Sequence, residues 1–119
     1  MISFFVQGRP IPKQSTRFVD GHCYTPRRVR DWQANVTLAA YVAMAGEPLL
    51  AGPLEVTLVF HMPTRKWGDL DNLSKCVLDA MNRVVYADDS QVCHLDITRV
   101  LDKANPGVWV SVGPWEPPF

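Results

Sequence analysis

The chain has 119 residues, of which 47% are hydrophobic, which is enough for one hydrophobic core, so we expect a single domain over residues 1–119. Its apolar runs are far shorter than the roughly 20 residues that span a bilayer, and its start lacks a basic segment followed by a cleavage site. Three cysteines without a C-x-x-C pair fit reduced thiols better than disulfides. The sequence therefore predicts a soluble, unprocessed, cytoplasmic protein without membrane segments.

The formal net charge is zero, but the charges are unevenly distributed along the chain. Residues 1–46 contain six lysines and arginines and two acids, whereas residues 47–119 contain six and ten. Lysine and arginine contact backbone phosphates, and carboxylates bind metals. The asymmetry fits a phosphate-contacting first part and a metal-binding second part, although a merely solvated basic surface explains it equally well.

The first apolar run, residues 1–7, ends at Gly8 and predicts a strand. Residues 8–24 have no apolar periodicity and predict a loop, in which Lys13 and Arg17 are candidates to contact a phosphate backbone. A helix should follow, with Thr25 as its N-cap, Pro26 at its first position and Gly46 at its end. Two further candidates for DNA contact lie in its first turn, Arg27 and Arg28.

Residues 53–62 alternate between apolar and other side chains, which predicts a strand with one buried face. Residues 63–68 interrupt this pattern and place Arg65 and Lys66 beside Trp67. A basic pair next to an aromatic ring suits the rim of a nucleic-acid site. It also suits an ordinary polar connection with one packed tryptophan.

A second helix is predicted after residues 69–72, because apolar residues recur at helical spacing from Leu73 to Val84. Its opposite face carries four charged residues, each four positions from the last: Asp71, Lys75, Asp79 and Arg83. They predict a ladder of exposed ion pairs, with Asp71 or Asn72 as the N-cap. Alternatively, Lys75 contacts a phosphate held at a metal beside Asp71; for Asp79 and Arg83 the ion-pair interpretation is preferred.

Two alternating segments, residues 91–101 and 108–112, follow Asp89 and are joined by a turn at residues 105–107. They predict a closing β-hairpin. The element order is then β-α-β-α-β-β. This order predicts a small α/β (α+β-like) domain with a mixed four-stranded sheet and helices on one face.

Four aspartates flank the second predicted helix, with Asp69 and Asp71 before it and Asp88 and Asp89 after it. Neighbouring carboxylates repel one another, and a hard divalent cation such as Mg²⁺, bound by oxygen at about 2.0–2.1 Å, relieves that repulsion. The three histidines show no ligand-like spacing. This stretch is therefore interpreted as a metal site.

The same stretch resembles the signature of the RusA family of Holliday-junction resolvases. The matching residues are His61-Met62-Pro63, Asp69-Leu70-Asp71-Asn72-Leu73, Lys75, Asp79-Ala80, Asp88-Asp89 and Gln91-Val92. The similarity is dense over about residues 61–95 and loose elsewhere. It implies a homodimeric, Mg²⁺-dependent endonuclease, with Mn²⁺ as a possible substitute, that nicks opposing strands of a four-way DNA junction.

The resemblance also implies residue roles. It makes Asp69, Asp71 and Asp89 the metal-binding catalytic acids, Lys75 catalytic or phosphate-contacting, and Asp88 a supporting ligand. Relatives can show a run of basic residues before the first aspartate, where this chain has the sequence RKWG over residues 65–68.

The distance along the second helix leads to a further hypothesis. A helix of about 13 residues between Asp71 and Asp89 would be roughly 20 Å long, so its two ends cannot reach one ion. Unless residues 85–87 fold back, each site would combine Asp69 and Asp71 of one chain with Asp89 of its partner across a two-fold axis.

Other classes of protein also use grouped aspartates. An EF-hand is excluded by register, because Leu73 would occupy its fifth position and Ala80 its bidentate glutamate. An aspartate-based phosphotransferase would place its first aspartate directly after a buried strand, whereas residues 63–68 intervene here. This phosphotransferase and a non-catalytic DNA-binding module, with carboxylates as caps and turn residues, remain the alternatives.

Overall fold

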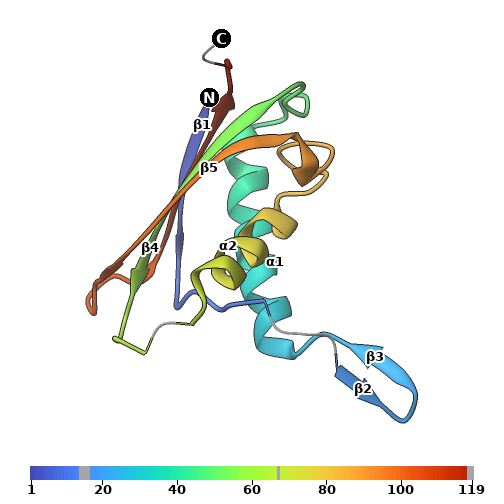
Figure 1. Cartoon of the computed structure of the whole chain (residues 1–119), viewed down its shortest axis with the longest axis vertical. Coiled ribbons are helices and arrows are strands. Elements are labelled where there is room, and N and C mark those ends of the chain that lie inside the picture. The colour runs from blue at the N-terminus through green and yellow to red at the C-terminus, as the bar shows by residue number, and fades with distance from the viewer. Residues whose placement is uncertain (14–16, 67, 118–119) are drawn as a thin grey trace.

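The computed structural model describes residues 1–13, 17–66 and 68–117, without the side chains of residues 17–19 and 23. Trp67, predicted as part of a nucleic-acid rim, lies outside the described residues. Figure 1 shows the elements in chain order: β1 (Ile2–Gln7), β2 (Arg17–Val19), β3 (His22–Tyr24), α1 (Arg27–Met44), β4 (Leu54–Met62), α2 (Leu70–Ala80), the 3₁₀ helix η1 (Asp89–Gln91), β5 (Val92–Leu101) and β6 (Gly107–Pro114).

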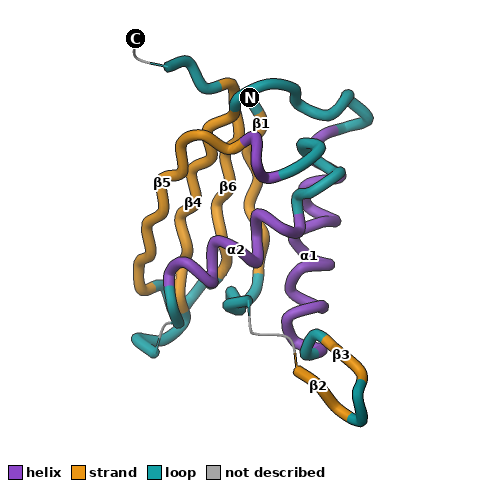
Figure 2. Tube along the Cα trace, turned by 45° about the vertical axis from the view of Figure 1, so that its right-hand side comes forward, coloured by secondary structure: helices purple, strands orange, loops and turns teal. Residues whose placement is uncertain are grey.

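The main sheet has four strands in the order β1-β6-β4-β5. Strand β6 is antiparallel to both β1 and β4, whereas β5 is parallel to β4. Both long helices cover the same face of this sheet (Figure 2). The predicted mixed sheet with helices on one face is therefore confirmed.

The predicted closing hairpin is wrong, because β5 and β6 pair with opposite sides of β4. Strand β6 is mostly buried and suits the interior of the sheet, while β5 is mostly exposed and suits its edge. Residues 102–106 pass the end of β4: Asp102 donates its backbone N–H to the Met62 carbonyl, and Gly8 donates to the Pro106 carbonyl.

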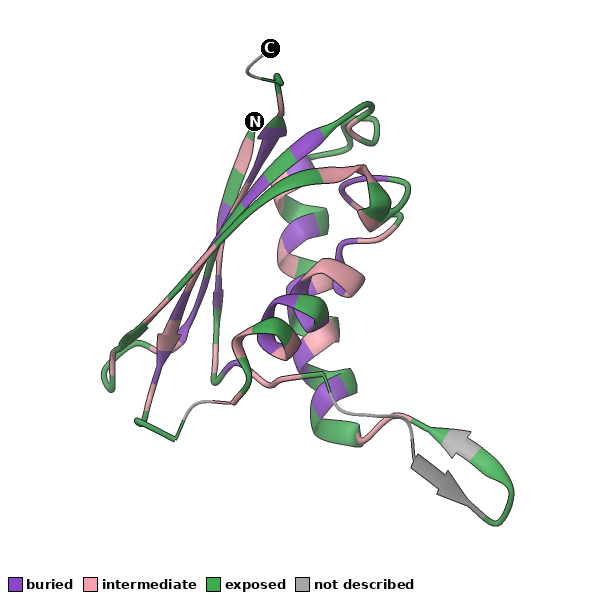
Figure 3. Cartoon of the chain, in the orientation of Figure 1, coloured by how far each residue is buried: buried purple, intermediate pink, exposed green. Residues whose placement is uncertain are grey.

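The core lies between the helices and the sheet, where buried side chains of α1, α2 and β4 meet (Figure 3). Strand β4 alternates as predicted, with every second residue from Leu54 to Met62 buried.

Within the described ranges, no helix is long and apolar enough to cross a membrane.

Both helices begin elsewhere than predicted. Pro26, in an extended conformation, takes the cap position of α1 in place of Thr25. Asp69 caps α2, in place of Asp71 or Asn72. At its other end α2 stops at Ala80, before the predicted apolar stripe ends at Val84.

The predicted loop over residues 8–24 contains a short hairpin, because β2 pairs with β3. Its two-residue turn is Asp20-Gly21, with φ of 50° and 76°. Asp-Gly is a preferred sequence for such a turn, and this dipeptide was the signal that could have predicted the hairpin.

Gly107 is the first residue of β6 and pairs with Gln7 of β1. A Cβ atom at this position would lie 2.3 Å from the Val6 carbonyl oxygen and 2.4 Å from Phe5 Cζ. We expect Gly107→Ala to lower the free energy of unfolding by about 3 kcal/mol, because the two strands must separate. Denaturant unfolding measures this loss. The control is Gly113→Ala in the same strand, whose Cβ would meet Met1 at an ordinary 3.4 Å; equal stability of the two variants would contradict the close approach.

Candidate functional site

Asp69 and Asp71 stand together at the start of α2. Asp69 is in an extended conformation, and its Oδ1 accepts the backbone N–H of Asp71 at 3.0 Å. Its carbonyl accepts the N–H of Leu73 at 3.0 Å, as the first hydrogen bond of the helix. Both carboxylates are exposed and gain from the partial positive charge of the helix start. Asp69 is therefore an N-cap whose second oxygen is not used by the cap.

Three contacts from two other segments hold this helix start in place. Arg99, on β5, donates a hydrogen bond from Nη1 to the carbonyl of Gly68. Gly68 packs against Pro12 so closely that a Cβ there would lie 3.0 Å from Pro12 Cγ. The backbone N–H of Lys13 donates to the Asn72 carbonyl at 2.9 Å. The position of the two carboxylates is thus fixed by the edge strand and by the segment after β1.

The predicted ladder of ion pairs along α2 is wrong. Asp79 pairs with Lys13, which comes from the segment after β1, and Arg83 lies beyond the helix with a φ of 65°. Lys75 is exposed one turn after Asp71 and forms no ion pair with any residue that the structure describes. Its ammonium group is therefore available to a ligand.

Asp88 shapes the turn that follows α2. Its Oδ2 accepts the backbone N–H of Ser90 at 3.0 Å, and Gln91 completes a capping box by accepting the N–H groups of Ala87 and Asp88. Hydrogen bonding with Ser90, through its side chain and its backbone, lowers the pKa of the Asp88 carboxyl. The amide group of Gln91 also donates to the Leu50 and Gly52 carbonyls. The turn is thus anchored to the chain before β4.

Asp89, in this turn, lies beside Asp79. Burial, the negative charges of Asp88 and Asp79, and hydrogen bonding with Asp79 together raise the pKa of Asp89, against an opposing effect of Lys13. Nearby, the fully buried Tyr86 donates from its hydroxyl to the Leu78 carbonyl at 2.8 Å and ties the turn to α2. Asp89 therefore belongs to a cluster with Asp79 and Lys13.

The chain does not gather the predicted metal ligands in one place. Asp79 comes ten positions after Asp69 along α2, which is about 15 Å at 1.5 Å per residue, and Asp89 lies at the Asp79 end. Among the described residues, no group of three or more His, Cys, Asp or Glu side chains is arranged to hold a metal ion. Asp69 and Asp71 form one acidic pair, and Asp79 and Asp89 form another.

The predicted DNA-contacting cations come from several separate elements of the chain. Arg27 is exposed, and its Nε lies 3.7 Å from Oδ2 of Asp31. Arg65 is exposed, and the side chain of Arg17 lies outside the described part of the chain. Arg28 and Lys66 line a cavity together with Arg9. Arg9 was not among the predicted DNA contacts, and Asp79 was not predicted as a neighbour of Asp89.

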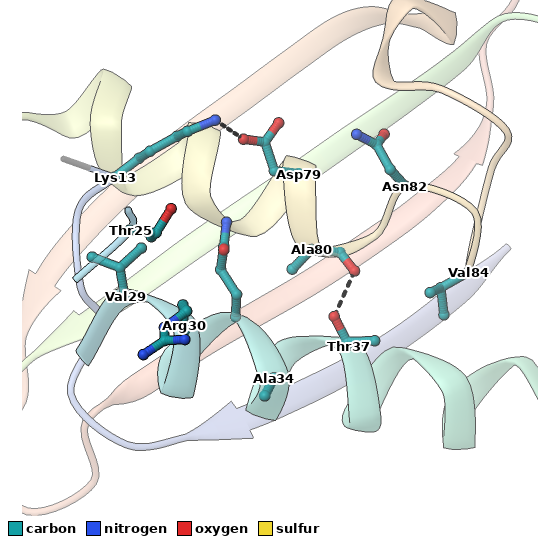
Figure 4. A pocket seen from close by; sticks show the side chains of 11 residues that line it. Lys13, Thr25, Val29, Arg30, Ala34, Thr37, Asp79, Ala80, Asn82 and Val84 are labelled. Atoms are coloured by element: carbon teal, nitrogen blue, oxygen red, sulfur yellow. Dashed lines mark hydrogen bonds and ion pairs between the residues drawn. The ribbon is translucent and has the colours of Figure 1, made fainter. Parts of the chain in front are cut away.

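A second cavity, of about 490 Å³, opens between α1 and α2 (Figure 4). Lys13 and Asp79 meet at its edge, and across it Thr37 donates to the Ala80 carbonyl at 2.8 Å. On the buried face of α2, burial raises the pKa of the Cys76 thiol to about 11. This cysteine is therefore an inert core residue.

A pair of exposed carboxylates at a held helix start, with a lysine one turn later, can bind a cation and a phosphate side by side. Arg9, Arg28 and Lys66 line a cavity together with Gly68, the residue before this pair. The combination defines a class of protein that acts on the phosphodiesters of nucleic acid.

Comparison with known proteins gives the family. The family model described as "Endodeoxyribonuclease RusA" matches residues 7–113. A crossover junction endodeoxyribonuclease RusA from Aquifex aeolicus is 25% identical over 121 residues, covering 98% of this chain and 94% of the relative. Its counterpart from Escherichia coli K12 is 36% identical over 52 residues, 43% of each chain. The uncharacterized protein YqaN of Bacillus subtilis is 27% identical, covering 82% of this chain and 86% of its own.

The chain belongs to the RusA family of endodeoxyribonucleases, as its signature residues predicted. It is a nuclease that acts on DNA phosphodiester bonds.

Proposed function

We propose that this nuclease resolves four-way DNA junctions by paired symmetric nicks, with Mg²⁺ as its cofactor and Mn²⁺ as a substitute. The exposed pair of Asp69 and Asp71, held by β5 and by the segment after β1, carries the proposal. The printed names of the Aquifex aeolicus and Escherichia coli relatives, crossover junction endodeoxyribonucleases, support the junction as substrate. Residues 1–119 would form one nuclease domain that acts in the cytoplasm during DNA recombination and repair.

The donor atoms at the start of α2 fit a hard divalent cation. Asp69 uses only Oδ1 for the cap, so its Oδ2 and the exposed carboxylate of Asp71 supply the oxygen ligands that Mg²⁺ prefers. When bound there, the ion would make the attacking water more acidic and offset the charge that grows on the scissile phosphate.

Lys75 would contact the phosphate itself. It lies one turn beyond Asp71 on the exposed side of α2, so its ammonium group can reach an anion held at the same helix start and offset part of its negative charge. Asp88 would act as a supporting residue, because its cap fixes the turn that carries Asp89.

We also propose that each site is shared between the two chains of a homodimer. Asp89 lies beside Asp79, and Asp79 is about 15 Å from Asp69 along α2. This separation supports a partner chain as the source of the third carboxylate. Strand β5 starts directly after the 3₁₀ helix η1, whose first residue is Asp89, and near its other end Arg99 holds the residue before Asp69. It is also the edge of the sheet, with exposed Leu95, Val100 and Leu101.

Edge strands pair readily with other strands. Antiparallel pairing of two β5 strands across a two-fold axis would place the start of one β5 beside the end of the other. Asp89 of one chain would then approach Asp69 and Asp71 of its partner, and the dimer would carry two such sites. Two symmetric sites suit a junction that must be cut in two opposing strands.

The test is cleavage of a labelled synthetic four-way junction. We expect Mg²⁺ or Mn²⁺ to support nicks at symmetric positions in two opposing strands, chelation to abolish them, and linear duplex of the same sequence to stay intact. Binding of the junction without cleavage in either metal would favour a non-catalytic DNA-binding module. An aspartate-based phosphotransferase has no support from the fold, since Asp69 begins a helix instead of following a buried strand.

A further inference from the structure

Three basic residues from distant parts of the chain converge on one cavity of about 400 Å³. Arg9 follows β1, Arg28 lies in the first turn of α1, and Lys66 lies between β4 and α2. The remaining lining residues are Pro10, Ile11, Pro12, Met62 and Gly68. Within the described part of the chain, no acidic residue lines this cavity, and none of the three cations forms an ion pair.

Converging cations without a counter-charge repel one another, and a bound anion relieves that repulsion. Two of the three are arginines, whose planar guanidinium groups match a phosphate through paired hydrogen bonds. The apolar walls around them reduce competition from water. The chemistry of the cavity therefore selects a phosphate group.

The wall that carries Arg9 is fixed before any ligand binds. At one end Gly8 donates to the Pro106 carbonyl at 3.0 Å, and at the other Lys13 donates to the Asn72 carbonyl at 2.9 Å. Two prolines lie between these bonds. Pro10 is buried, and Pro12 is partly buried and packs against Gly68. Proline restricts the backbone, so binding at Arg9 costs little ordering entropy.

The cavity is next to the acidic pair, because Gly68 lines it and Asp69 follows directly in the chain. We propose that it binds a backbone phosphate of the DNA strand that is cut, beside the scissile phosphate itself. Arg9, Arg28 and Lys66 would thereby set the position of that strand over Asp69 and Asp71. This inference rests on the proposed function, since it takes the start of α2 as the place of cleavage.

The test compares Arg9→Gln, Arg28→Gln and the double variant with a matched control, Arg83→Gln. Arg83 is an exposed arginine beyond the end of α2 and does not line the cavity, so the control removes the same charge at another place in the chain. Junction binding is measured with Ca²⁺ in place of Mg²⁺ over a series of salt concentrations. We expect each cavity variant to weaken binding roughly tenfold or more, as for a lost hydrogen bond to a charged group. The slope of binding against salt should fall by about one per lost phosphate contact.

Cleavage at saturating junction separates this inference from the proposed function. At saturating junction the arginine variants should still cleave, with a loss of rate smaller than their loss of affinity, and Arg9→Lys should restore part of the affinity. Asp71→Asn should show the reverse, with binding retained and cleavage lost. If the arginine variants bind no worse than Arg83→Gln while the wild type cuts junctions, the cavity proposal is overturned and the proposed function stands.

Inorganic phosphate tests a free anion as the natural ligand. We expect millimolar phosphate to compete with the junction for the wild-type protein and to have less effect on the double variant. Phosphate could stabilise the wild type against heat and not the double variant, while the double variant binds the junction as well as Arg83→Gln does. That pair of results would assign the cavity to free phosphate and overturn its role in binding DNA. Melting curves of all variants without ligand confirm that each is folded.

Discussion

We expect Asp69→Asn to lose DNA cleavage while keeping the wild-type fold, and Asp69→Ala to lose both cleavage and stability. Asp69 has two roles in the structure, because its Oδ1 caps α2 and its carboxylate belongs to the proposed metal site. Asparagine caps a helix about as well as aspartate, whereas alanine does not. The two substitutions therefore separate the cap from the chemistry.

The expected magnitudes follow from each role. Losing one charged ligand should lower the cleavage rate by roughly 10²–10³-fold or more, since a metal ion contributes several kcal/mol to stabilising the transition state. Losing the cap should cost about 1 kcal/mol of unfolding free energy in Asp69→Ala, and less than about 0.5 kcal/mol in Asp69→Asn. Junction nicking measures the first effect and urea unfolding the second.

Asp71→Asn provides the internal comparison. The Asp71 side chain makes no cap bond, and only its backbone N–H takes part. It should therefore lose cleavage as Asp69→Asn does, without a loss of stability beyond that of the exposed charge. Cleavage by Asp69→Asn at the wild-type rate would make Asp69 a cap and nothing more.

Local patterns in the sequence predicted the elements that periodicity specifies. The alternation over β4 and the apolar stripe from Leu73 to Met81 both face the core as expected. The order of the strands did not follow, because a local turn signal at residues 105–107 suggested that neighbouring segments pair. The strand order follows burial instead. The valines of β6 occupy the interior of the sheet, and the more polar β5 occupies its edge.

The acidic site was predictable only in part, for a similar reason. The local pattern placed Asp69 and Asp71 near the helix start, although it predicted Asp71 or Asn72 as the cap that Asp69 provides. The pairing of Lys13 with Asp79 joins residues 66 positions apart. The segment that carries Arg9 is held by hydrogen bonds from Gly8 to Pro106 and from Lys13 to Asn72 in α2. Contacts of this kind depend on the whole fold, which no single motif encodes.

The second large effect concerns a mixed dimer. We expect a heterodimer of one Asp71→Asn chain and one Asp89→Asn chain to regain cleavage, although each mutant homodimer is inactive. If each site combines Asp69 and Asp71 of one chain with Asp89 of the other, both substitutions fall in one of the two sites. The other site then contains only wild-type residues.

The restored activity should have a distinct pattern. A mixed dimer with one intact site should nick one strand of the junction, so nicked junctions accumulate and resolved duplexes do not. Differently tagged chains, co-expressed and purified through both tags, give the heterodimer free of homodimers. Labels on all four strands identify which strand is cut.

The decisive control is a heterodimer of Asp69→Asn with Asp71→Asn. Both residues stand at the same helix start, so each site receives one substitution whether or not the chains share sites, and no activity should return. Rescue by the first pair but not by the second requires that the acids at the two ends of α2 meet across the dimer. Failure of both pairs, with intact wild-type activity, would instead require residues 81–89 to move so that Asp89 reaches Asp69 in its own chain. The structure opposes such a movement, because the Tyr86 hydroxyl and the Gln91 side chain tie this turn to α2 and to the chain before β4.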